Sequence, residues 1–247
     1  MPGEIYHLDT VDSTNDYIKR NIAVIPDGSV VWADEQTKGK GRLGREWKGP
    51  KGNLYASFVY QNPPGDVALY PLLSGLAVFR TIAALTGIQG KIKWPNDVLI
   101  GEKKTCGILC ESIISSSQIY IICGIGINVN VGADAFSREA LPYATSLGIE
   151  TGKTYDLEKV LEELSRQMEQ IRAEWGQHGF AALKQQYEKQ LISLGKTVQV
   201  IYQRETLVGT CLGIAENGNL RCQLEDGREI LVNSGEASVR GIYGYAV

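Results

Sequence analysis

Four strand signals occupy one stretch of the chain, residues 91–129, which reads KIKWPNDVLIGEKKTCGILCESIISSSQIYIICGIGINV. Apolar and β-branched runs lie at residues 91–94, 98–100, 105–114 and 118–129. Turn-forming segments separate them: Pro95-Asn96-Asp97, Gly101-Glu102-Lys103 and Ser115-Ser116-Ser117. Connections this short favour antiparallel neighbours, because a parallel crossover needs a dozen or more residues. The stretch therefore predicts a meander of mostly adjacent antiparallel strands.

Upstream of this meander the chain predicts three strands and two helices. The strand signals lie at residues 4–8, 28–34 and 54–60. The polar run Asp12-Ser13-Thr14-Asn15 offers N-caps for a short helix that reaches about Asn21. Apolar residues at helical spacing predict a second helix over residues 68–86, and Gly87 ends it.

Downstream, two amphipathic helices precede a change of pattern. Apolar residues recur at helical spacing from Leu157 to Trp175 behind the N-cap Asp156, and again from Phe180 to a predicted end at Gly195. Short strand signals then follow at residues 197–201, 207–214, 219–224 and 228–232. Asn-Gly and Asp-Gly pairs at residues 217–218 and 226–227 predict hairpin turns. The last fifty or so residues are thus expected to form a small separate β-barrel.

Composition narrows the class of protein. The chain has 247 residues, 43% of them hydrophobic and 21% charged, which suits one large globular domain or a large domain with a small appendage. A net charge of −3 argues against a general nucleic-acid binder. No apolar run reaches the roughly 18 residues of a membrane span, and the N-terminus does not resemble a signal peptide. We expect a cytoplasmic protein that binds neither nucleic acid nor membrane.

Cysteine and histidine offer little chemistry. The five cysteines form no CxxC pair and lie in apolar or strand-like runs, so buried reduced thiols are expected. His7 and His178 are the only histidines and lie in unrelated contexts, which argues against zinc chemistry or a histidine-based triad. The chemistry is expected to rest on Lys, Arg and Asp.

One segment, residues 38–51, is rich in both positive charge and glycine, and its core at Gly39–Trp47 is called the basic loop below. The segment carries six lysines and arginines and four glycines, with a fifth glycine directly after it at Gly52 and with Glu46 as its only acid. Fixing nine such residues costs on the order of 10 kcal/mol of backbone entropy, whereas a charge-assisted hydrogen bond returns about 1.5–3 kcal/mol. Two interpretations stay open: a mobile loop that folds over an anionic ligand, and a solvated basic loop with no ligand.

Within this segment, the pattern Gly39-x-Gly41-x-x-Gly44 is weak evidence by itself. A dinucleotide-binding loop requires a helix at the third glycine, and Gly49-Pro50 follows too soon for one. A kinase loop requires His-Arg-Asp and Asp-Phe-Gly downstream, and the chain contains neither tripeptide.

A combination of five motifs is far more specific. They are residues 36–47 (QTKGKGRLGREW), 93–97 (KWPND), 12–15 (DSTN), 103–109 (KKTCGIL) and 124–128 (GIGIN). Together and in this order they resemble the signatures of biotin-protein ligases, and the resemblance runs from about residue 5 to the C-terminus. It implies an α+β fold of the class II synthetase type: a central mixed sheet with helices on one side in residues 1–194, then a small SH3-like barrel in residues 195–247.

The resemblance also implies a two-step reaction. Biotin's carboxylate attacks the α-phosphate of ATP with Mg²⁺, which gives biotinyl-5′-adenylate and pyrophosphate. A lysine of a biotin carboxyl carrier protein then takes the biotinyl group and releases AMP. Because the first step joins two anions, positive charge must be held where charge builds up.

The residues that match the family's motifs receive roles by this resemblance. Catalysis is expected of Lys104, Arg42 and Arg45. Biotin binding is expected of Ser13, Thr14, Asn15, Gln36, Gly39, Lys40, Arg42, Lys104, Gly107 and Gly126. ATP binding is expected of Arg42, Arg45, Trp47, Lys93, Asn96 and Asn128, with Trp47 closing over the adenylate, and no metal ligand is assigned.

Several of these residues have structural alternatives. The polar cluster at residues 12–15 could simply cap a helix, Trp94 could be a packed core aromatic, and Asn96 and Asp97 could form a turn. Lys40 stands where many relatives carry Arg, which keeps the charge but loses the bidentate fork. The first strand begins near Glu4, so no DNA-binding extension and no repressor activity are expected.

Two other functions compete with biotin ligation. A lipoate or octanoate ligase shares the fold and the adenylate chemistry, but would lack this form of the basic loop. A non-catalytic biotin or nucleotide sensor would not need Lys104. Because members of the family are often dimers through sheet edges, a homodimer is also expected.

Overall fold

The computed structural model describes residues 3–47, 51–115, 117–202, 205–234 and 237–241. Expectations that concern Lys48, Gly49, Pro50 and Ser116 lie outside the described residues.

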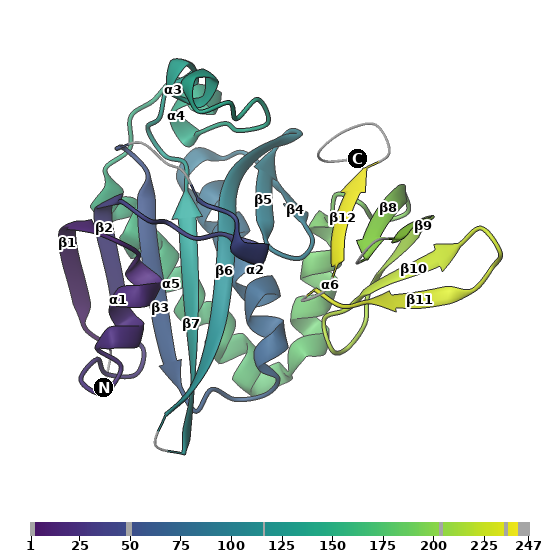
Figure 1. Cartoon of the computed structure of the whole chain (residues 1–247), viewed down its shortest axis with the longest axis horizontal. Coiled ribbons are helices and arrows are strands. Elements are labelled where there is room, and N and C mark those ends of the chain that lie inside the picture. Colours follow the sequence, from purple (N-terminus) through teal and green to yellow (C-terminus); the bar gives the residue numbers. More distant parts are fainter. Residues whose placement is uncertain (1–2, 48–50, 116, 203–204, 235–236, 242–247) are drawn as a thin grey trace.

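A seven-stranded mixed sheet forms the centre of the molecule, in the order β1-β2-β3-β7-β6-β5-β4 (Figure 1). Its strands are β1 (Ile5–Val11), β2 (Val30–Gln36), β3 (Leu54–Gln61), β4 (Lys91–Lys93), β5 (Asp97–Ile100), β6 (Lys103–Ser115) and β7 (Gln118–Ile127). Strands β1 and β2 are parallel, and all other neighbours are antiparallel. The predicted meander is confirmed as β4 to β7, because each short turn joins two neighbouring strands.

Three long helices cover one face of this sheet: α2 (Tyr70–Thr86), α5 (Leu157–His178) and α6 (Phe180–Gln190). A 3₁₀ turn, η2 (Val67–Leu69), precedes α2, and Gly87 ends α2 in the left-handed region at φ 76°. Asp156 caps α5 by accepting from the Glu158 amide, as predicted. Helix α6 stops before the expected end at Gly195. Two short helices, α3 (Ala133–Arg138) and α4 (Leu147–Thr151), were not predicted.

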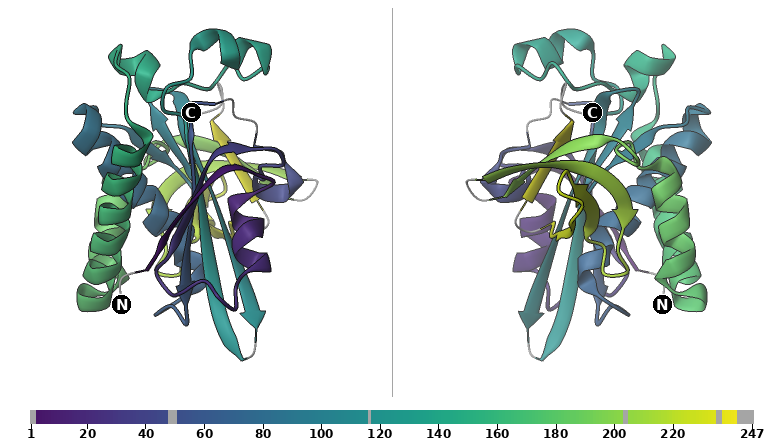
Figure 2. Two further views of the ribbon diagram at one scale, coloured as in Figure 1. Left: turned by 90° about the vertical axis from the view of Figure 1, so that its left-hand side faces the viewer. Right: turned by 90° about the vertical axis from the view of Figure 1, so that its right-hand side faces the viewer.

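The short helix α1 (Thr14–Arg20) lies on the opposite face of the sheet (Figure 2). Its fully buried Ile18 packs with Val31, Val59 and Ile122 in a second, smaller apolar cluster. Because helices cover both faces, β3 is buried along nearly its whole length. The helical span Val67–Thr86, formed by η2 and α2, is long and apolar enough to cross a membrane by length and composition alone, but it is mostly buried inside the protein.

The C-terminal strands form a second, antiparallel sheet in the order β11-β10-β9-β8-β12, which corresponds to the expected SH3-like unit. They are β8 (Thr197–Tyr202), β9 (Glu205–Ile214), β10 (Leu220–Leu224), β11 (Glu229–Val232) and the unpredicted β12 (Ala237–Gly241). Buried side chains of this sheet, among them Val198 and Cys211, join the same apolar core as α2 and α6. The boundary between residues 194 and 195 stays a prediction, and the apolar core runs across it.

All five cysteines are free thiols, and all but the half-buried Cys110 are fully buried. Burial raises the pKa of the Cys222 thiol to about 12, and it raises the pKa of Cys106 as well. The expectation of buried free thiols is confirmed for four of the five cysteines, and Cys110 is half-buried.

Candidate functional site

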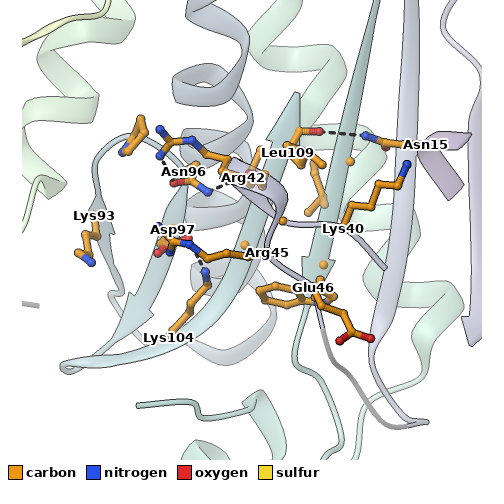
Figure 3. Close-up of a pocket in the computed structure, with 18 of the residues that line it drawn as sticks. Asn15, Lys40, Arg42, Arg45, Glu46, Lys93, Asn96, Asp97, Lys104 and Leu109 are labelled. Carbon is orange, nitrogen blue, oxygen red and sulfur yellow. Dashed lines mark hydrogen bonds and ion pairs between the residues drawn. The ribbon is translucent and has the colours of Figure 1, made fainter. Parts of the chain in front are cut away.

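A pocket on the α1 face of the main sheet brings the sequence motifs together (Figure 3). Segments far apart in the chain line it: the start of α1, the basic loop, the β4–β5 turn, β6, β7 and β12. Thirteen of the residues assigned from the sequence line this pocket: Ser13, Thr14, Asn15, Gln36, Lys40, Arg42, Arg45, Trp47, Lys93, Asn96, Lys104, Gly107 and Gly126.

The basic loop folds back on itself as a small hairpin. The Trp47 amide donates to the Gly39 carbonyl at 2.9 Å, and the Gly41 amide donates to the Arg45 carbonyl at 2.7 Å. Between them a 3₁₀ turn, η1 (Arg42–Gly44), places Leu43 and Gly44 at φ 57° and 72°. Protein hydrogen bonds therefore define the loop's shape, and its predicted mobility stays a prediction.

Two glycines make the pocket floor flat enough for Trp47 to lie against it. Gly107 of β6 and Gly126 of β7 are directly opposite partners in the sheet. A Cβ atom on Gly107 would lie 2.4 Å from Trp47 Cζ3, and one on Gly126 would lie 2.7 Å from Trp47 Nε1. Any larger residue would have to displace the indole. Trp47 Nε1 is buried and has no hydrogen-bond partner among the described residues.

One end of the pocket is cationic. Arg42 Nη1 donates to Asn96 Oδ1 at 3.0 Å, and Arg42 Nη2 donates to the Ser234 carbonyl. Asn96 also donates to the Ile108 carbonyl at 2.9 Å. The β4–β5 turn, which carries Asn96, therefore helps to orient Arg42. Burial, reinforced by the charge of Arg45 and opposed by Asp97, lowers the pKa of Arg42. Arg42 is thus held in place before any ligand contact.

Two lysines complete this end. Lys104 Nζ lies 2.6 Å from Asp97 Oδ1 and 5.0 Å from the Trp47 ring centre. Burial lowers the pKa of Lys93 to about 8; Lys104 and other nearby cations add to this effect, and Asp97 opposes it. Burial is thus the main cause of the lowered pKa of Lys93, and the neighbouring cations lower it further.

Uncharged polar side chains, among them Thr14 and Gln36, line the other end of the pocket, called the uncharged end below, and Lys40 lies beside them. Gln36 Oε1 accepts from the Thr14 amide at 2.8 Å and from Thr14 Oγ1 at 3.0 Å. Ser57 Oγ lies 2.7 Å from Thr14 Oγ1 and 2.6 Å from Asn15 Oδ1, and can donate its proton to one of them. Asn15 Nδ2 donates to Glu111 Oε2 at 2.8 Å. Such a network fixes the direction of each donor and acceptor.

Three assigned or debated positions have mainly structural surroundings. Gly39 lies outside the pocket lining, and a Cβ there would meet the Trp47 carbonyl at 2.6 Å. Asn128 also lies outside it and donates to the Thr145 carbonyl at 3.0 Å. Trp94 is buried, and its indole donates to the Gly218 carbonyl at 3.0 Å, which favours the packed aromatic over a ligand contact. Binding by Gly39 and Asn128 stays a prediction.

The capping alternative for the polar cluster at residues 12–15 holds for Ser13, and biotin binding by this cluster stays a prediction. Ser13 caps α1, where its hydroxyl accepts from the Asp16 amide at 3.5 Å, while Thr14 and Asn15 turn into the network. The sequence did not point to Ser57, Glu111 or Arg240. Ser57 and Arg240 lie in strands without a motif, and Glu111 lies in β6 beyond the end of the motif at residues 103–109.

The pocket therefore suits a ligand with an uncharged, hydrogen-bonding head and an anionic group at the opposite end. Arginine forks and lysine point charges at that end can hold carboxylate and phosphate together. Among the described lining residues, Glu46 and Asp97 are the carboxylates, and Figure 3 shows the Glu46 side chain directed away from Asp97.

Known proteins are similar to this chain in both sequence and fold. The Biotin/lipoate A/B protein ligase family matches residues 8–128, and the Biotin protein ligase C terminal domain matches residues 193–240. The biotin–[acetyl-CoA-carboxylase] ligase of Paracoccus denitrificans is 31% identical over 91% of this chain and 96% of its own length.

A longer relative and a solved structure agree with this match. The bifunctional ligase/repressor of Bacillus spizizenii is 35% identical over 82% of this chain, which spans 63% of that protein. The structure of biotin protein ligase from Aquifex aeolicus in complex with biotin and ATP is 33% identical, covers 96% of this chain and 99% of its own, and superposes with a TM-score of 0.83.

Proposed function

The chain belongs to the biotin protein ligase family, and from this premise we propose that its pocket joins biotin to AMP and passes the biotinyl group to a lysine of a carrier protein. The observation that carries the proposal is the polarity of the pocket. Biotin has an uncharged ureido ring at one end and a carboxylate at the other, which match the Thr14–Gln36 end and the cationic end.

The first step needs two anions to meet. A carboxylate oxygen of biotin attacks the α-phosphorus of ATP, the bond to the β-phosphate oxygen breaks, and pyrophosphate leaves with the electron pair. Arg42, Arg45, Lys93 and Lys104 surround the cationic end and offset the charge that builds up there. Since Asn96 already holds Arg42, less ordering is needed when the ligand arrives.

Lys104 is proposed as the catalytic point charge. Its ammonium is held by Asp97 at 2.6 Å, which keeps it in the pocket instead of in bulk solvent. When an anionic carboxylate or phosphate binds, the same ammonium can donate further protons in hydrogen bonds, because it has three N–H groups. Asp97 therefore positions the lysine.

Trp47 is proposed as the lid over the adenylate. The mixed anhydride is open to hydrolysis, so water must be kept away until the carrier lysine arrives. In this structure the indole lies directly against Gly107 and Gly126, so it must lift off these glycines to cover a bound adenylate. In the second step the neutral lysine amine attacks the acyl carbon, and AMP leaves.

Magnesium fits the cationic end through one carboxylate. Mg²⁺ bound with nucleotides takes one or two carboxylates, phosphate oxygens and water. We assign Asp97 as the protein group available to it, since Glu46 is directed elsewhere (Figure 3). When bound, the ion would neutralise part of the phosphate charge.

The partner, the oligomeric state and the location follow from the same premise. The carrier lysine would reach the acyl carbon at the open mouth of the pocket.

A homodimer would form through the sheet edge at β1, whose Ile5 is exposed. Light scattering with and without biotin and ATP measures the dimer; a monomer in both conditions would contradict it. Cytoplasmic location stays a prediction.

A single assay separates the proposed function from its nearest alternative. The protein is incubated with ATP, Mg²⁺, an isolated biotin carboxyl carrier domain and labelled biotin, and parallel reactions contain lipoate or octanoate with a lipoyl domain. Biotin-dependent pyrophosphate release and label on the carrier lysine are expected. Transfer of lipoate alone would identify a lipoate ligase, and binding of biotin without pyrophosphate release would identify a sensor.

A further inference from the structure

One cation of the basic loop does not join the cationic end. Lys40 Nζ lies 2.6 Å from Asp16 Oδ2 in the first turn of α1. In Figure 3 the Lys40 side chain runs toward Asn15 and away from Arg45 and Lys104. Its charge is therefore directed to α1 and the uncharged end of the pocket.

Asp16 is the branching point of a charged network. Its Oδ1 lies 3.5 Å from Lys19 Nζ, and Lys19 Nζ lies 2.7 Å from Glu111 Oε1. Glu111 Oε2 accepts from Asn15 Nδ2 at 2.8 Å. A continuous path of opposite charges thus links the basic loop, α1 and β6, and it ends on a residue that lines the pocket.

The electrostatics agree with this geometry. Burial opposes ionisation of Asp16, but the hydrogen bond and charge of Lys40, with help from Lys19, outweigh it and lower the pKa of Asp16. Asp16 in turn raises the pKa of Lys40. The Asp16 side chain is 21% exposed and that of Lys40 is 48% exposed, so solvent screens the pair in part and its strength is that of a partly exposed ion pair.

We propose that Asp16 is a positioning residue that latches the basic loop over the uncharged end of the pocket through Lys40, and orients Asn15 through Lys19 and Glu111. This inference rests on the proposed function and deepens it. Asp16 does not line the pocket, so its effect on a bound biotinyl group passes through Lys40. By holding Lys40, it sets how long the basic loop stays closed. It also gives Lys40 a role that needs one point charge and no bidentate fork.

The test compares Asp16→Asn, Lys40→Gln and the double variant of these two substitutions. Arg20→Gln is the matched control, because it breaks a neighbouring ion pair of α1, to Asp12 at 2.7 Å, that does not reach the loop. Two readouts are used: dissociation of biotinyl-5′-adenylate in a chase, and hydrogen exchange of the Gly41 and Trp47 amides without ligand.

Each single variant is expected to speed adenylate dissociation and amide exchange about twofold to fivefold, the range for a partly exposed ion pair. The double variant should be no worse than either single one, because both substitutions remove the same ion pair. Wild-type rates in Asp16→Asn, equal effects in Arg20→Gln, or additive effects in the double variant would overturn the latch. Hydrogen exchange needs no ligand, so it still reports on the latch if the wild-type protein makes no adenylate.

Discussion

Gly107→Ala tests whether the place of Trp47 beside the pocket floor controls how long the adenylate stays bound. The backbone of Gly107 is one that alanine can adopt, so the effect comes from the added methyl alone. That methyl would lie 2.4 Å from Trp47 Cζ3, so the indole must retreat by roughly 1 Å to regain van der Waals contact. Overpacking of this kind costs about 1–3 kcal/mol. Because Trp47 is only partly buried and can move, we expect the lower half of that range.

A loss of about 1.4 kcal/mol would speed adenylate release about tenfold. The assay forms labelled biotinyl-5′-adenylate on the enzyme, adds excess unlabelled biotin and ATP, and follows the label that leaves the protein. Gly176→Ala is the control, because Gly176 lies in α5 and a Cβ there meets no atom within 4 Å. Its release rate should match wild type.

A double-mutant cycle with Trp47→Ala identifies the cause. Once the indole is removed, Gly107→Ala has no ring to displace and should add nothing to the release rate. If Gly107→Ala alone retains adenylate as well as wild type, or has the same effect with and without the indole, the lid does not work through this contact.

Other predictions concern charge and stability. Lys104→Met should slow pyrophosphate release about 10²–10³-fold while biotin binding by calorimetry stays measurable; unchanged turnover would exclude a catalytic role. Lys93 has a pKa of about 8 against an ordinary 10.5, so it is neutral above that pH, and ATP affinity in titrations should fall as pH rises through about 8 in wild type but not in Lys93→Arg. Between about pH 8 and 10.5, Lys93 holds its proton in the unfolded chain but not in the folded protein. Its contribution to the free energy of unfolding therefore rises with pH over this range. Asn128→Ala leaves the Thr145 carbonyl without its donor and should lower stability by about 1–3 kcal/mol in urea unfolding; a large rise in the KM for ATP would instead support its predicted binding role.

Local patterns were enough to predict the main elements of the fold. The turns between strands β4 to β7 are too short for a parallel crossover, so antiparallel pairing could be predicted. The spacing of apolar residues behind the cap Asp156 predicted the start of α5. Strand β12 was missed because it has five residues, carries no hairpin signal, and is defined by pairing with β8 some forty residues earlier. Helices α3 and α4 have six and five residues, too few to show a helical period.

For the site, the sequence predicted the motif residues but not their supports. Arg42 and Lys104 were expected in the pocket and line it. Ser57 and Glu111 were not expected, since Ser57 lies in an otherwise apolar strand and Glu111 reads as an ordinary charged residue of β6. Their importance comes from neighbours more than 40 residues away, namely Thr14 and Asn15, and no local pattern encodes such contacts.

The direct pairing of Gly107 with Gly126 has a consequence for folding. A slip of one residue between β6 and β7 would turn every side chain to the other face, so Ile108 or Ile125 would stand where the indole now lies. A misregistered molecule would then have no room for a ligand, and only the correctly paired form could bind. Biotin and ATP added during refolding should therefore stabilise the correct register by mass action and raise the fraction of molecules with correctly paired strands.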